Sequence, residues 1–433
     1  MIVNHLNTFP YGGAATAGMR LHRQMLNDGI QSNFYFANDD RKTSLEPGVK
    51  KIAWDRPNST TNPIARIFEK RRLRRIYSQY DEHIAGRDEN LELFSMAELE
   101  QRTALPANEV NQQVFHLHWL AFMIDFPSFF SSIPVSTPII WTLHDMNPLT
   151  GGCHYSSGCN RFVKGCGKCP LIQSPGPRDV SAQSFRIKKN ALRKHNLNVV
   201  APSIWLKELA QSSPVFPRST TFHHIRLGFD LRQLFPMNKQ AARKQLGLES
   251  EKILIGFGCE SVGNHRKGFD LLVSALASLP DKSKVECVVF GSGNLPATNS
   301  DLPKIHHLGF INGPEQLTQF YSACDFVVVP SREDNQPQVG LEAMACGTPV
   351  VGFDIGGISE YVKPGITGWL ARPENAADLG VQMNKLITDA DSRKLMGQRC
   401  HQMMQQDFDI VKQSRKYQNL YGSLLDASAR IAA

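Results

Sequence analysis

The chain has 433 residues, of which 41% are hydrophobic and 20% are charged, and its formal net charge is +8 with an isoelectric point near 9.0. This length is enough for two or three domains with cores of their own, and the composition is ordinary for a soluble globular protein. The mild positive charge fits an anionic small molecule, an anionic membrane face or nucleic acid, and it does not choose among them.

No uninterrupted apolar run approaches the roughly 18 residues that a membrane span requires. The N-terminal sequence MIVNHLNTFPYGG lacks a basic start and a long apolar stretch, so we expect no signal peptide. We therefore expect a cytoplasmic protein whose nine cysteines are thiols or metal ligands and do not form a disulfide framework.

Short apolar, β-rich runs alternate with helical patterns through most of the chain. The runs predict nine strands, at residues 1–6, 32–37, 114–120, 137–145, 198–203, 252–258, 284–293, 326–331 and 349–354. Helical patterns lie between them, for example at residues 16–29, 269–279, 315–323, 339–347 and 375–389. This alternation predicts parallel sheets that are covered by helices.

Nine strands are too many for one ordinary sheet, and a natural break falls between His224 and Pro236. We predict an α/β protein of two doubly wound Rossmann-like domains, residues 1–228 and 229–410. Because ligands of such sheets bind outside the carboxyl ends of the strands, two facing domains would form a central cleft.

Residues 64–80 interrupt the alternation with an amphipathic, strongly basic helical pattern. Ile64, Ile67, Phe68, Ile76, Tyr77 and Tyr80 recur at helical spacing, and Arg71, Arg72, Arg74 and Arg75 fill other positions. One interpretation is a surface helix with a solvated basic side. The other is contact with an anionic membrane or a lipid-phosphate acceptor.

Two motifs in the first half follow predicted strands. Gly12 and Gly13 stand before a helix, where a backbone can approach a ligand closely and the helix start favours an anion; the alternative is a tight turn only. His116 and His118 lie two residues apart at a strand's carboxyl end and share one face, so a site and a buried structural pair remain equal alternatives.

A cysteine-rich run follows the fourth predicted strand, and its spacing is C-x5-C-x6-C-x2-C. The cysteines are Cys153, Cys159, Cys166 and Cys169. In a cytoplasmic protein four cysteines in a Gly-rich loop suggest a tetrahedral zinc site that holds the loop together. Reduced thiols and a redox role are the alternatives. The other five cysteines stand in apolar contexts typical of a core.

Two cations and three acids are candidate binding residues in the second half of the chain. Arg266 and Lys267 stand where a loop turns into a helix, and such a pair can neutralise a diphosphate; a solvated loop charge is the alternative.

The stretch SREDNQPQVGLEAMACG, residues 331–347, follows a buried strand. Asp334 and Glu342, eight residues apart, could accept hydrogen bonds from the hydroxyls of a sugar and a ribose. We expect Pro337 to occupy the first position of a helix, which would offer free amides at Gln338, Val339 and Gly340.

Together these motifs resemble glycosyltransferase family 4, retaining enzymes of the GT-B fold, over nearly the whole chain apart from residues 55–105. The most specific parts are the acid-x7-E pattern that continues into AMACGTPVVG, the GG-x-x-E pattern at residues 356–360, and TGWL after it. The HLHW and WTLHDMNPLTGGCH segments with CGKCP are similar to a bacterial subgroup that builds surface polysaccharides.

The resemblance implies roles in an acceptor-side domain, residues 1–228, and a nucleotide-sugar-binding domain, residues 229–410. Gly12 and Gly13 match the glycine loop near the donor phosphates and the acceptor. His118 matches the histidine of the catalytic centre, and His116 is a second candidate. The C-terminal helix, residues 411–433, is expected to pack back on the first domain.

In the second domain Lys267, with Arg266, matches the cation on the donor diphosphate. Asp334 matches the first acid of the family's pair, which holds the donor sugar, and Glu342 matches the second, which holds the ribose. Counting back from Glu342 selects Asp334 over the adjacent Glu333.

The sequence departs from the family pattern at three places. The first acid is an aspartate, the Gly-Phe-Gly that follows it is Asn335-Gln336-Pro337, and the usual arginine six residues before the lysine is Ser261. The last change makes neutralisation of the diphosphate depend more on Arg266 and Lys267.

The resemblance therefore implies a retaining glycosyltransferase that moves a sugar from a nucleotide diphosphate donor to a glycan or lipid-linked glycan during exopolysaccharide, capsule or O-antigen synthesis. No catalytic metal, no catalytic cofactor and no nucleic-acid partner are expected. The Asp-x-Asp at residues 389–391 is interpreted as a helix start. A GT-B sugar-nucleotide epimerase and a non-catalytic sugar-nucleotide-binding protein remain as alternatives.

Overall fold

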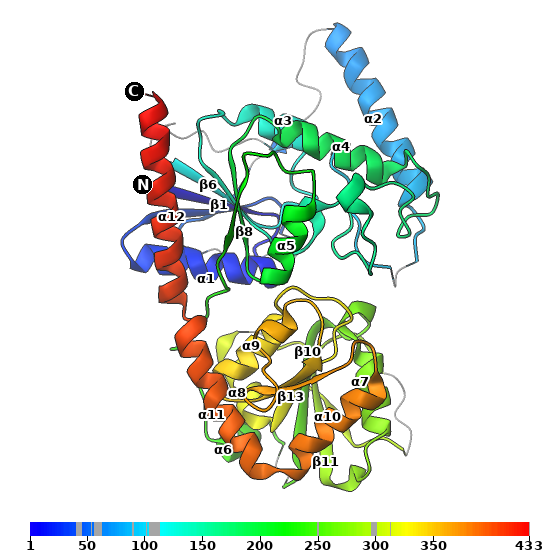
Figure 1. Cartoon of the computed structure of the whole chain (residues 1–433), viewed down its shortest axis with the longest axis vertical. Helices are drawn as coiled ribbons and strands as arrows, with labels where there is room; N and C mark the ends of the chain where they lie inside the picture. The colour runs from blue at the N-terminus through cyan, green and yellow to red at the C-terminus, as the bar shows by residue number, and fades with distance from the viewer. Residues whose placement is uncertain are drawn as a thin grey trace. The chain divides into compact units, whose positions relative to one another are not determined.

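The computed structural model describes residues 1–39, 46–52, 54–55, 63–88, 91–100, 102–103, 113–248, 251–295, 301–311 and 313–432. It divides the chain into two compact units, Met1–Ile225 with Ser414–Ala433, and Arg226–Gln413 (Figure 1). The boundary between the units falls between residues 225 and 226, whereas it was predicted from the sequence to follow residue 228. Ala433, the last residue of the predicted C-terminal helix, lies outside the described residues.

The N-terminal unit contains a seven-stranded sheet with the order β3-β2-β1-β6-β7-β8-β9. All neighbouring strands in it are parallel. The strands are β1 (Ile2–Asn7), β2 (Gln31–Phe36), β3 (Val49–Lys51), β6 (Gln113–Leu117), β7 (Ile139–Thr142), β8 (Leu197–Ala201) and β9 (Thr221–His224). Strands β4 (Trp54–Asp55) and β5 (Arg102–Thr103) form a separate antiparallel pair.

The C-terminal unit contains a six-stranded parallel sheet with the order β12-β11-β10-β13-β14-β15. The strands are β10 (Ile253–Ser261), β11 (Val285–Ser292), β12 (Ile305–His307), β13 (Phe326–Val329), β14 (Val350–Phe353) and β15 (Gly368–Ala371). The two doubly wound α/β domains predicted from the sequence are thus confirmed. All nine predicted strands are present in the two sheets.

The helices connect and cover the two sheets. They are α1 (Gly13–Asn27), α2 (Pro63–His83), α3 (Phe126–Ser132), α4 (Val180–Leu192), α5 (Ile204–Ser212), α6 (Lys239–Gln245), α7 (Phe269–Ala277), α8 (Pro314–Ala323), α9 (Gln338–Ala345), α10 (Ala376–Thr388), α11 (Ala390–Asp407) and α12 (Ile410–Ala432). As predicted for the Asp-x-Asp, the Asp389 side chain caps α11 by accepting a hydrogen bond from the Ser392 amide at 2.9 Å. Among the described residues no helix is both long and apolar enough to cross a membrane.

Helix α12 carries the chain back onto the sheet of the N-terminal unit. Its Tyr417 and Tyr421 belong to the same buried apolar cluster as residues of β1, β6, β7 and β8. The Tyr417 hydroxyl lies 2.7 Å from Thr142 Oγ1, and the Tyr421 hydroxyl lies 2.6 Å from His116 Nδ1. Burial of two large aromatic side chains with paired hydroxyls explains why this segment groups with the first unit.

Each sheet has one point at which the strand order reverses direction. It lies between β1 and β6 in the N-terminal unit and between β10 and β13 in the C-terminal unit. Loops leave such a point toward opposite faces of the sheet, and the crevice that opens there is the usual ligand site of doubly wound folds. The segments that follow these four strands contain most of the residues predicted to carry chemistry.

Candidate functional site

Two cations and one carboxylate meet at the reversal point of the C-terminal sheet. Arg266 and Lys267 lie in a short 3-10 turn, His265–Lys267, after β10, and Asp334 lies in the loop after β13. Lys267 Nζ is 2.6 Å and Arg266 Nη1 is 3.0 Å from Asp334 Oδ2. The structure therefore joins three residues that the sequence had assigned to separate parts of a donor.

Local backbone geometry fixes this meeting. Asn264 Oδ1 accepts a hydrogen bond from the Arg266 amide at 3.0 Å, which closes the turn. Gly268 follows with φ 71°, and a Cβ atom there would lie 1.9 Å from the Pro330 carbonyl oxygen. Only glycine tolerates both conditions, so the loop after β10 can approach the end of β13 closely.

The Asp334 carboxylate is buried and ionised. Burial alone would raise its pKa, but the charges of Lys267 and Arg266 and their hydrogen bonds outweigh burial and lower the pKa to about 2. The Asp334 Oδ1 atom also accepts a hydrogen bond from the Asn335 amide at 3.0 Å. The cluster combines two positive charges with one negative charge, which leaves it net positive toward an incoming anion.

Glu333 and Asp334 contact the cations through different groups: Glu333 through its main-chain carbonyl and Asp334 through its carboxylate. Arg266 Nη1 donates to the main-chain carbonyl of Glu333 at 3.0 Å, whereas it reaches the side chain of Asp334. The Asp334 carbonyl accepts a hydrogen bond from the Gly357 amide at 3.1 Å, and a Cβ atom on Gly356 would lie 2.1 Å from that carbonyl. The glycine pair after β14 thus packs against Asp334.

Helix α9 begins at Gln338, and Pro337 is its N-cap. The helix therefore begins one residue later than predicted, because Pro337 was expected to be its first residue. The prediction of a free amide at Gly340 was wrong, because that amide donates to the Pro337 carbonyl at 3.2 Å in the first turn. Glu342 is buried on this helix, and its Oε2 atom accepts a hydrogen bond from the Tyr321 hydroxyl at 3.0 Å.

The reversal point of the N-terminal sheet combines the glycine loop with the end of β6. Gly12 is the N-cap of α1 with φ 87°, a conformation that favours glycine. The Thr8 amide and the Thr8 hydroxyl both bond the Trp119 carbonyl, at 2.8 and 2.9 Å. The Asn7 side chain accepts a hydrogen bond from the Trp119 amide at 2.9 Å. Gly12 and Gly13 therefore stand in the segment that is tied to the residue after His118.

His118 is the middle member of a row of three histidines. Its Nε2 atom is 3.0 Å from His5 Nδ1, and its Nδ1 atom is 3.0 Å from His144 Nε2. His116 lies beside this row, stacked on His118 at a ring-centroid distance of 4.3 Å, and its Nε2 atom is 2.7 Å from Thr142 Oγ1. His5 and His118 are buried, whereas His144 is partly exposed.

These imidazoles are neutral in the folded protein. Burial lowers the pKa of His118 well below 6.5, and the neighbouring histidines lower it further. Burial also lowers the pKa of His116 to about 3 and that of His144 to about 4. The row can pass or orient hydrogen bonds at neutral pH, but it does not supply a positive charge.

His5 and His144 were not identified from the sequence. A signal was present, because the LHD at the end of one predicted strand repeats the LHW at the end of another, and β6 and β7 prove to be neighbours. Asp145 follows His144 and bonds His154 Nδ1 at 2.6 Å, while the indole of Trp119 donates to Asp145 at 2.6 Å. Histidine and tryptophan at the end of β6 are thus fixed by the segment after β7.

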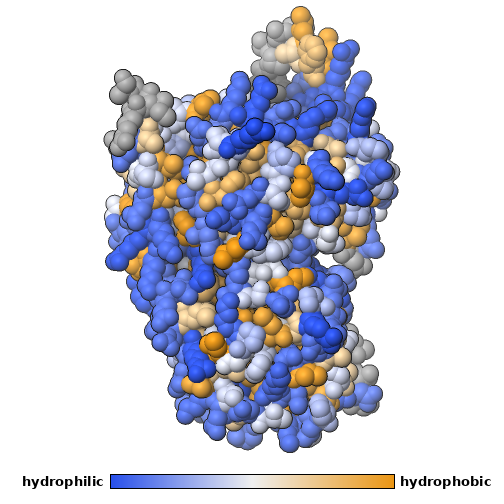
Figure 2. Space-filling model, viewed as in Figure 1, coloured by the Kyte–Doolittle hydropathy of each residue, from blue (hydrophilic) through white to orange (hydrophobic). Residues whose placement is uncertain are grey.

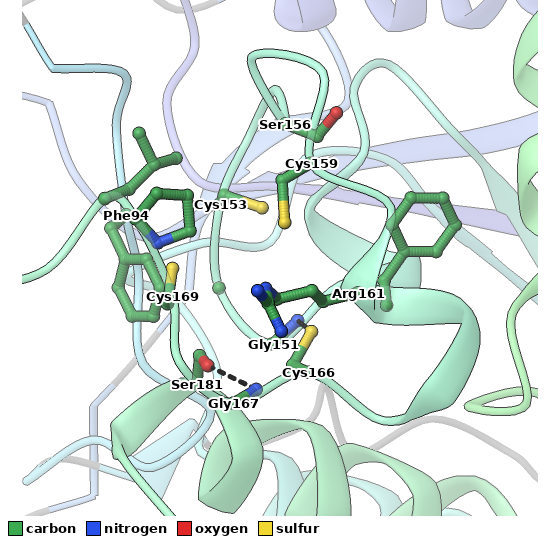
Figure 3. Close-up of a pocket in the computed structure, with 14 residues that line it drawn as sticks. Phe94, Gly151, Cys153, Ser156, Cys159, Arg161, Cys166, Gly167, Cys169 and Ser181 are labelled. Carbon is green, nitrogen blue, oxygen red and sulfur yellow. Dashed lines mark hydrogen bonds between the residues drawn. The ribbon is translucent and has the colours of Figure 1, made fainter. Parts of the chain in front are cut away.

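The four predicted metal-binding cysteines lie in that same segment. Cys153, Cys159, Cys166 and Cys169 all line one cavity beside α4 (Figure 3). Among the described residues, His5, His116 and His118 also form a group whose ligand atoms lie within 4.8 Å of one another. Both nitrogens of His116 and both of His118 are already hydrogen-bonded, so a metal ion there would have to displace these contacts.

Helix α2 contains the basic segment predicted at residues 64–80. Ile76 is buried, Arg75 pairs with Glu98, and Arg72 pairs with Asp125. These contacts attach the second half of the helix to the unit. The apolar positions near its start are exposed, with 65% for Ile64, 53% for Ile67 and 63% for Phe68.

Comparison with known proteins finds a similarity in the C-terminal unit. Residues 238–403 match the family model of the glycosyl transferases group 1. A D-inositol 3-phosphate glycosyltransferase of Nocardia farcinica is 35% identical over 188 residues, which are 40% of this chain and 41% of that protein. The chain thus spans less than half the length of this curated relative. The matched residues 238–403 contain Arg266, Lys267, Asp334 and Glu342, whereas the histidine row and the four cysteines of the predicted zinc site lie outside them.

Two solved structures resemble the whole chain in fold. Sucrose-phosphate synthase from Thermosynechococcus elongatus superposes with a TM-score of 0.68 at 17% identity, over 98% of this chain and 99% of its own. Anabaena Alr3699/HepE in complex with UDP-glucose superposes with a TM-score of 0.64 at 19% identity, over 98% and 100%. At these identities the likeness establishes the fold, which is the predicted GT-B fold.

Proposed function

We propose that the protein is a glycosyltransferase that moves a sugar from a nucleotide diphosphate donor to a hydroxyl group of an acceptor glycan. The observation that carries this proposal is the cluster of Arg266, Lys267 and Asp334 at the reversal point of the sheet in the domain that matches the group 1 glycosyl transferases. The choice of donor is further supported by a neighbour in fold whose structure holds UDP-glucose.

In the proposed reaction the bond between the anomeric carbon and the diphosphate breaks, and charge develops on the leaving phosphate oxygen. Lys267 and Arg266 are the groups that would stabilise this charge, because a positioned cation in a partly buried site acts strongly on developing negative charge. The diphosphate would share the two cations with Asp334. The proposal requires no catalytic metal ion, since two protein cations would face the leaving group.

We further propose that the anomeric configuration is retained. The acceptor hydroxyl would attack from the face that the diphosphate leaves, and its proton would pass to the leaving phosphate oxygen. No enzyme nucleophile then takes part. Asp334 is the group proposed to orient the donor sugar, and Glu342 is proposed for the ribose. Gln338 and Val339, at the start of α9, are proposed to bind the donor as well.

The N-terminal unit is proposed to serve the acceptor. His144, the partly exposed end of the histidine row, is better placed than buried His118 to contact a substrate, and His118 would orient it through their 3.0 Å contact. The glycine loop at Gly12 and Gly13 offers close approach of the backbone. An acceptor glycan of exopolysaccharide, capsule or O-antigen synthesis, free or linked to a lipid, fits this proposal.

We propose that the reaction takes place at the inner face of the plasma membrane and that helix α2 contacts the membrane. Its exposed start combines Ile64, Ile67 and Phe68 with exposed Lys70 and Arg71. Figure 2 presents orange, apolar surface at the outer end of this helix among hydrophilic residues. A helix that carries apolar and basic side chains together binds anionic lipid surfaces, where lipid-linked acceptors are found.

The proposal is tested by incubating the full-length protein with a panel of nucleotide sugars and following nucleotide release with and without acceptor glycans. Thermal shift identifies the donor first, because a bound ligand stabilises the folded state. We expect nucleotide release that rises with one class of acceptor. Isomerised donor without transfer would favour an epimerase, and binding without any turnover would favour a non-catalytic protein.

A further inference from the structure

The segment between β7 and α4 contains no α-helix or β-strand among its described residues. It runs from Leu143 to Asp179 and includes only two short 3-10 turns, Asn147–Leu149 and Arg161–Lys164. It nevertheless fixes Asp145, which accepts hydrogen bonds from the indole of Trp119 and from His154. A long irregular segment of this kind needs a source of stability other than backbone ladders.

We propose that Cys153, Cys159, Cys166 and Cys169 hold a structural zinc ion that supplies this stability. All four side chains come from the irregular segment and line a cavity of about 20 Å³. Figure 3 shows the four sulfur atoms around this one space. Four cysteine thiolates in tetrahedral arrangement are a standard ligand set of structural zinc.

The ligand set is complete without a histidine. His154 follows Cys153 directly, but its Nδ1 atom bonds Asp145 at 2.6 Å and its Nε2 atom is 3.1 Å from Ser95 Oγ. Both ring nitrogens are thus engaged, and the site has four cysteines. The sulfur atoms lie farther apart than the ligand atoms of His5, His116 and His118, which are all within 4.8 Å of one another.

The backbone already surrounds the sulfurs as a metal site requires. The Gly151 amide lies 3.2 Å from Cys166 Sγ, and the Leu171 amide hydrogen-bonds the Cys169 sulfur. Amide donors to the ligand atoms stabilise thiolates and orient them. Position 151 is restricted to glycine by a separate contact, since a Cβ atom there would lie 2.2 Å from the Ser181 carbonyl oxygen.

The turn between the last two cysteines is strained. Cys166, Gly167 and Lys168 have φ values of 62°, 94° and 50°, three consecutive residues in the left-handed region. This region is unfavourable for the non-glycine residues Cys166 and Lys168, and such strained conformations are found mainly where a site depends on them. This turn keeps both flanking cysteines on the same cavity.

Positive side chains surround the cysteines. Lys188 interacts electrostatically with Cys153 and Cys166, and Arg87 interacts with Cys153 and Cys169. Arg161 lines the cavity itself. A zinc ion with four thiolates carries two negative charges, and these cations would balance them.

The first test is the metal content of the full-length protein, purified without a histidine tag and measured by elemental mass spectrometry. We expect about one zinc ion per chain. Titration of the thiols with a mercurial reagent, followed with a chromogenic zinc chelator, should release that zinc as the four cysteines react. Protein that contains no zinc and takes up none from a zinc buffer overturns the proposal.

Variants then assign the ion to the cysteines. Cys166→Ser and Cys169→Ser should each lower the bound zinc about fivefold or more and lower the melting temperature. Cys400→Ser is the matched control, because Cys400 is a buried thiol that bonds the Thr367 carbonyl at 3.2 Å in the other unit, and its zinc content should be unchanged.

Substitution with cobalt separates this site from the histidines without relying on variants. Cobalt bound by four thiolates gives intense visible and sulfur-to-metal charge-transfer bands, whereas cobalt bound by imidazoles lacks the latter. Charge-transfer bands support the cysteine site. Their absence from cobalt-loaded protein, zinc retained in both cysteine variants, or disulfides found by mass mapping of the unreduced native protein would overturn it.

Discussion

Lys267 Nζ lies 2.6 Å from Asp334 Oδ2 across two loops that follow neighbouring strands of the C-terminal sheet. The side chains are partly and almost fully buried, with exposed fractions of 24% and 6%. Asp334 therefore holds Lys267 and Arg266 in position, and in the proposed enzyme it would also offer a carboxylate to the donor sugar.

Substitution of the two adjacent acids should separate these roles. Asp334→Asn should lower kcat/KM by about 100-fold or more, because it removes the acceptor that positions both cations. Glu333→Gln is the matched control, since Glu333 reaches Arg266 through its main-chain carbonyl, which the substitution retains. Steady-state kinetics with the identified donor measure both. A larger loss in Glu333→Gln would mean that Glu333 is the acid of the pair.

The stability of the protein should depend on the ionisation of Asp334. Its pKa in the folded state is about 2, below the ordinary value of 3.8. A lowered pKa stabilises the folded state above pH 3.8, and this contribution disappears as the pH falls from 3.8 toward about 2. Its size is about 2 kcal/mol, from about 1.4 kcal/mol for each pH unit.

Urea unfolding of the wild type and of Asp334→Asn at several pH values measures this contribution. The variant should be less stable by about 2 kcal/mol near neutral pH, and the difference should narrow below about pH 4. A difference that stays constant down to pH 3 would show that the ion pair does not contribute through the charge of Asp334.

The histidine row should not titrate in the pH range where the enzyme works. Since burial lowers the pKa of His118 well below 6.5, the imidazole stays neutral at mildly acidic pH. We therefore expect kcat/KM of the wild type to show no fall near pH 6.5 that can be assigned to His118. Any fall in that range should also be present in His118→Asn. A fall that is present in the wild type and lost in this variant would contradict a neutral His118.

The exposed start of α2 should bind anionic vesicles. Phe68→Ser should lower binding to vesicles rich in phosphatidylglycerol by several-fold, because Phe68 is 63% exposed beside basic residues. Val381→Ser is the control, since Val381 is 56% exposed on the other unit. Vesicle flotation measures both, and binding of the wild type should weaken with salt. Equal vesicle binding by the wild type and both variants would show that Phe68 of α2 does not contact the membrane.

Much of the fold followed from the sequence, because alternating apolar runs and helical patterns have few solutions other than parallel sheets. The strands that escaped prediction are short or polar, and several lie at the edges of the sheets. In β9, for example, none of the residues Thr221–His224 is fully buried. The helix at residues 64–80 was predicted, but the attachment of Arg72 and Arg75 to acids elsewhere depends on tertiary packing.

The candidate site was predicted only in part. The residue types and their places after strands were visible, because glycines, paired cations and acids stand out between apolar runs. The contact of Lys267 with Asp334 was not visible, because it depends on β10 and β13 being neighbours in the sheet. The same holds for His5, His118 and His144, which are far apart in sequence and meet because β1, β6 and β7 are adjacent.

The most direct test of the proposed function is sugar transfer by the wild type and by Lys267→Ala, with the identified donor and acceptor and with donor binding measured in parallel. We expect transfer by the wild type and a loss of about 100-fold or more in kcat for Lys267→Ala, because the variant lacks a cation on the leaving diphosphate. Lys267→Arg, which retains the charge, should recover part of that loss. An unchanged rate in Lys267→Ala with every donor would contradict the assignment of this cluster to the diphosphate.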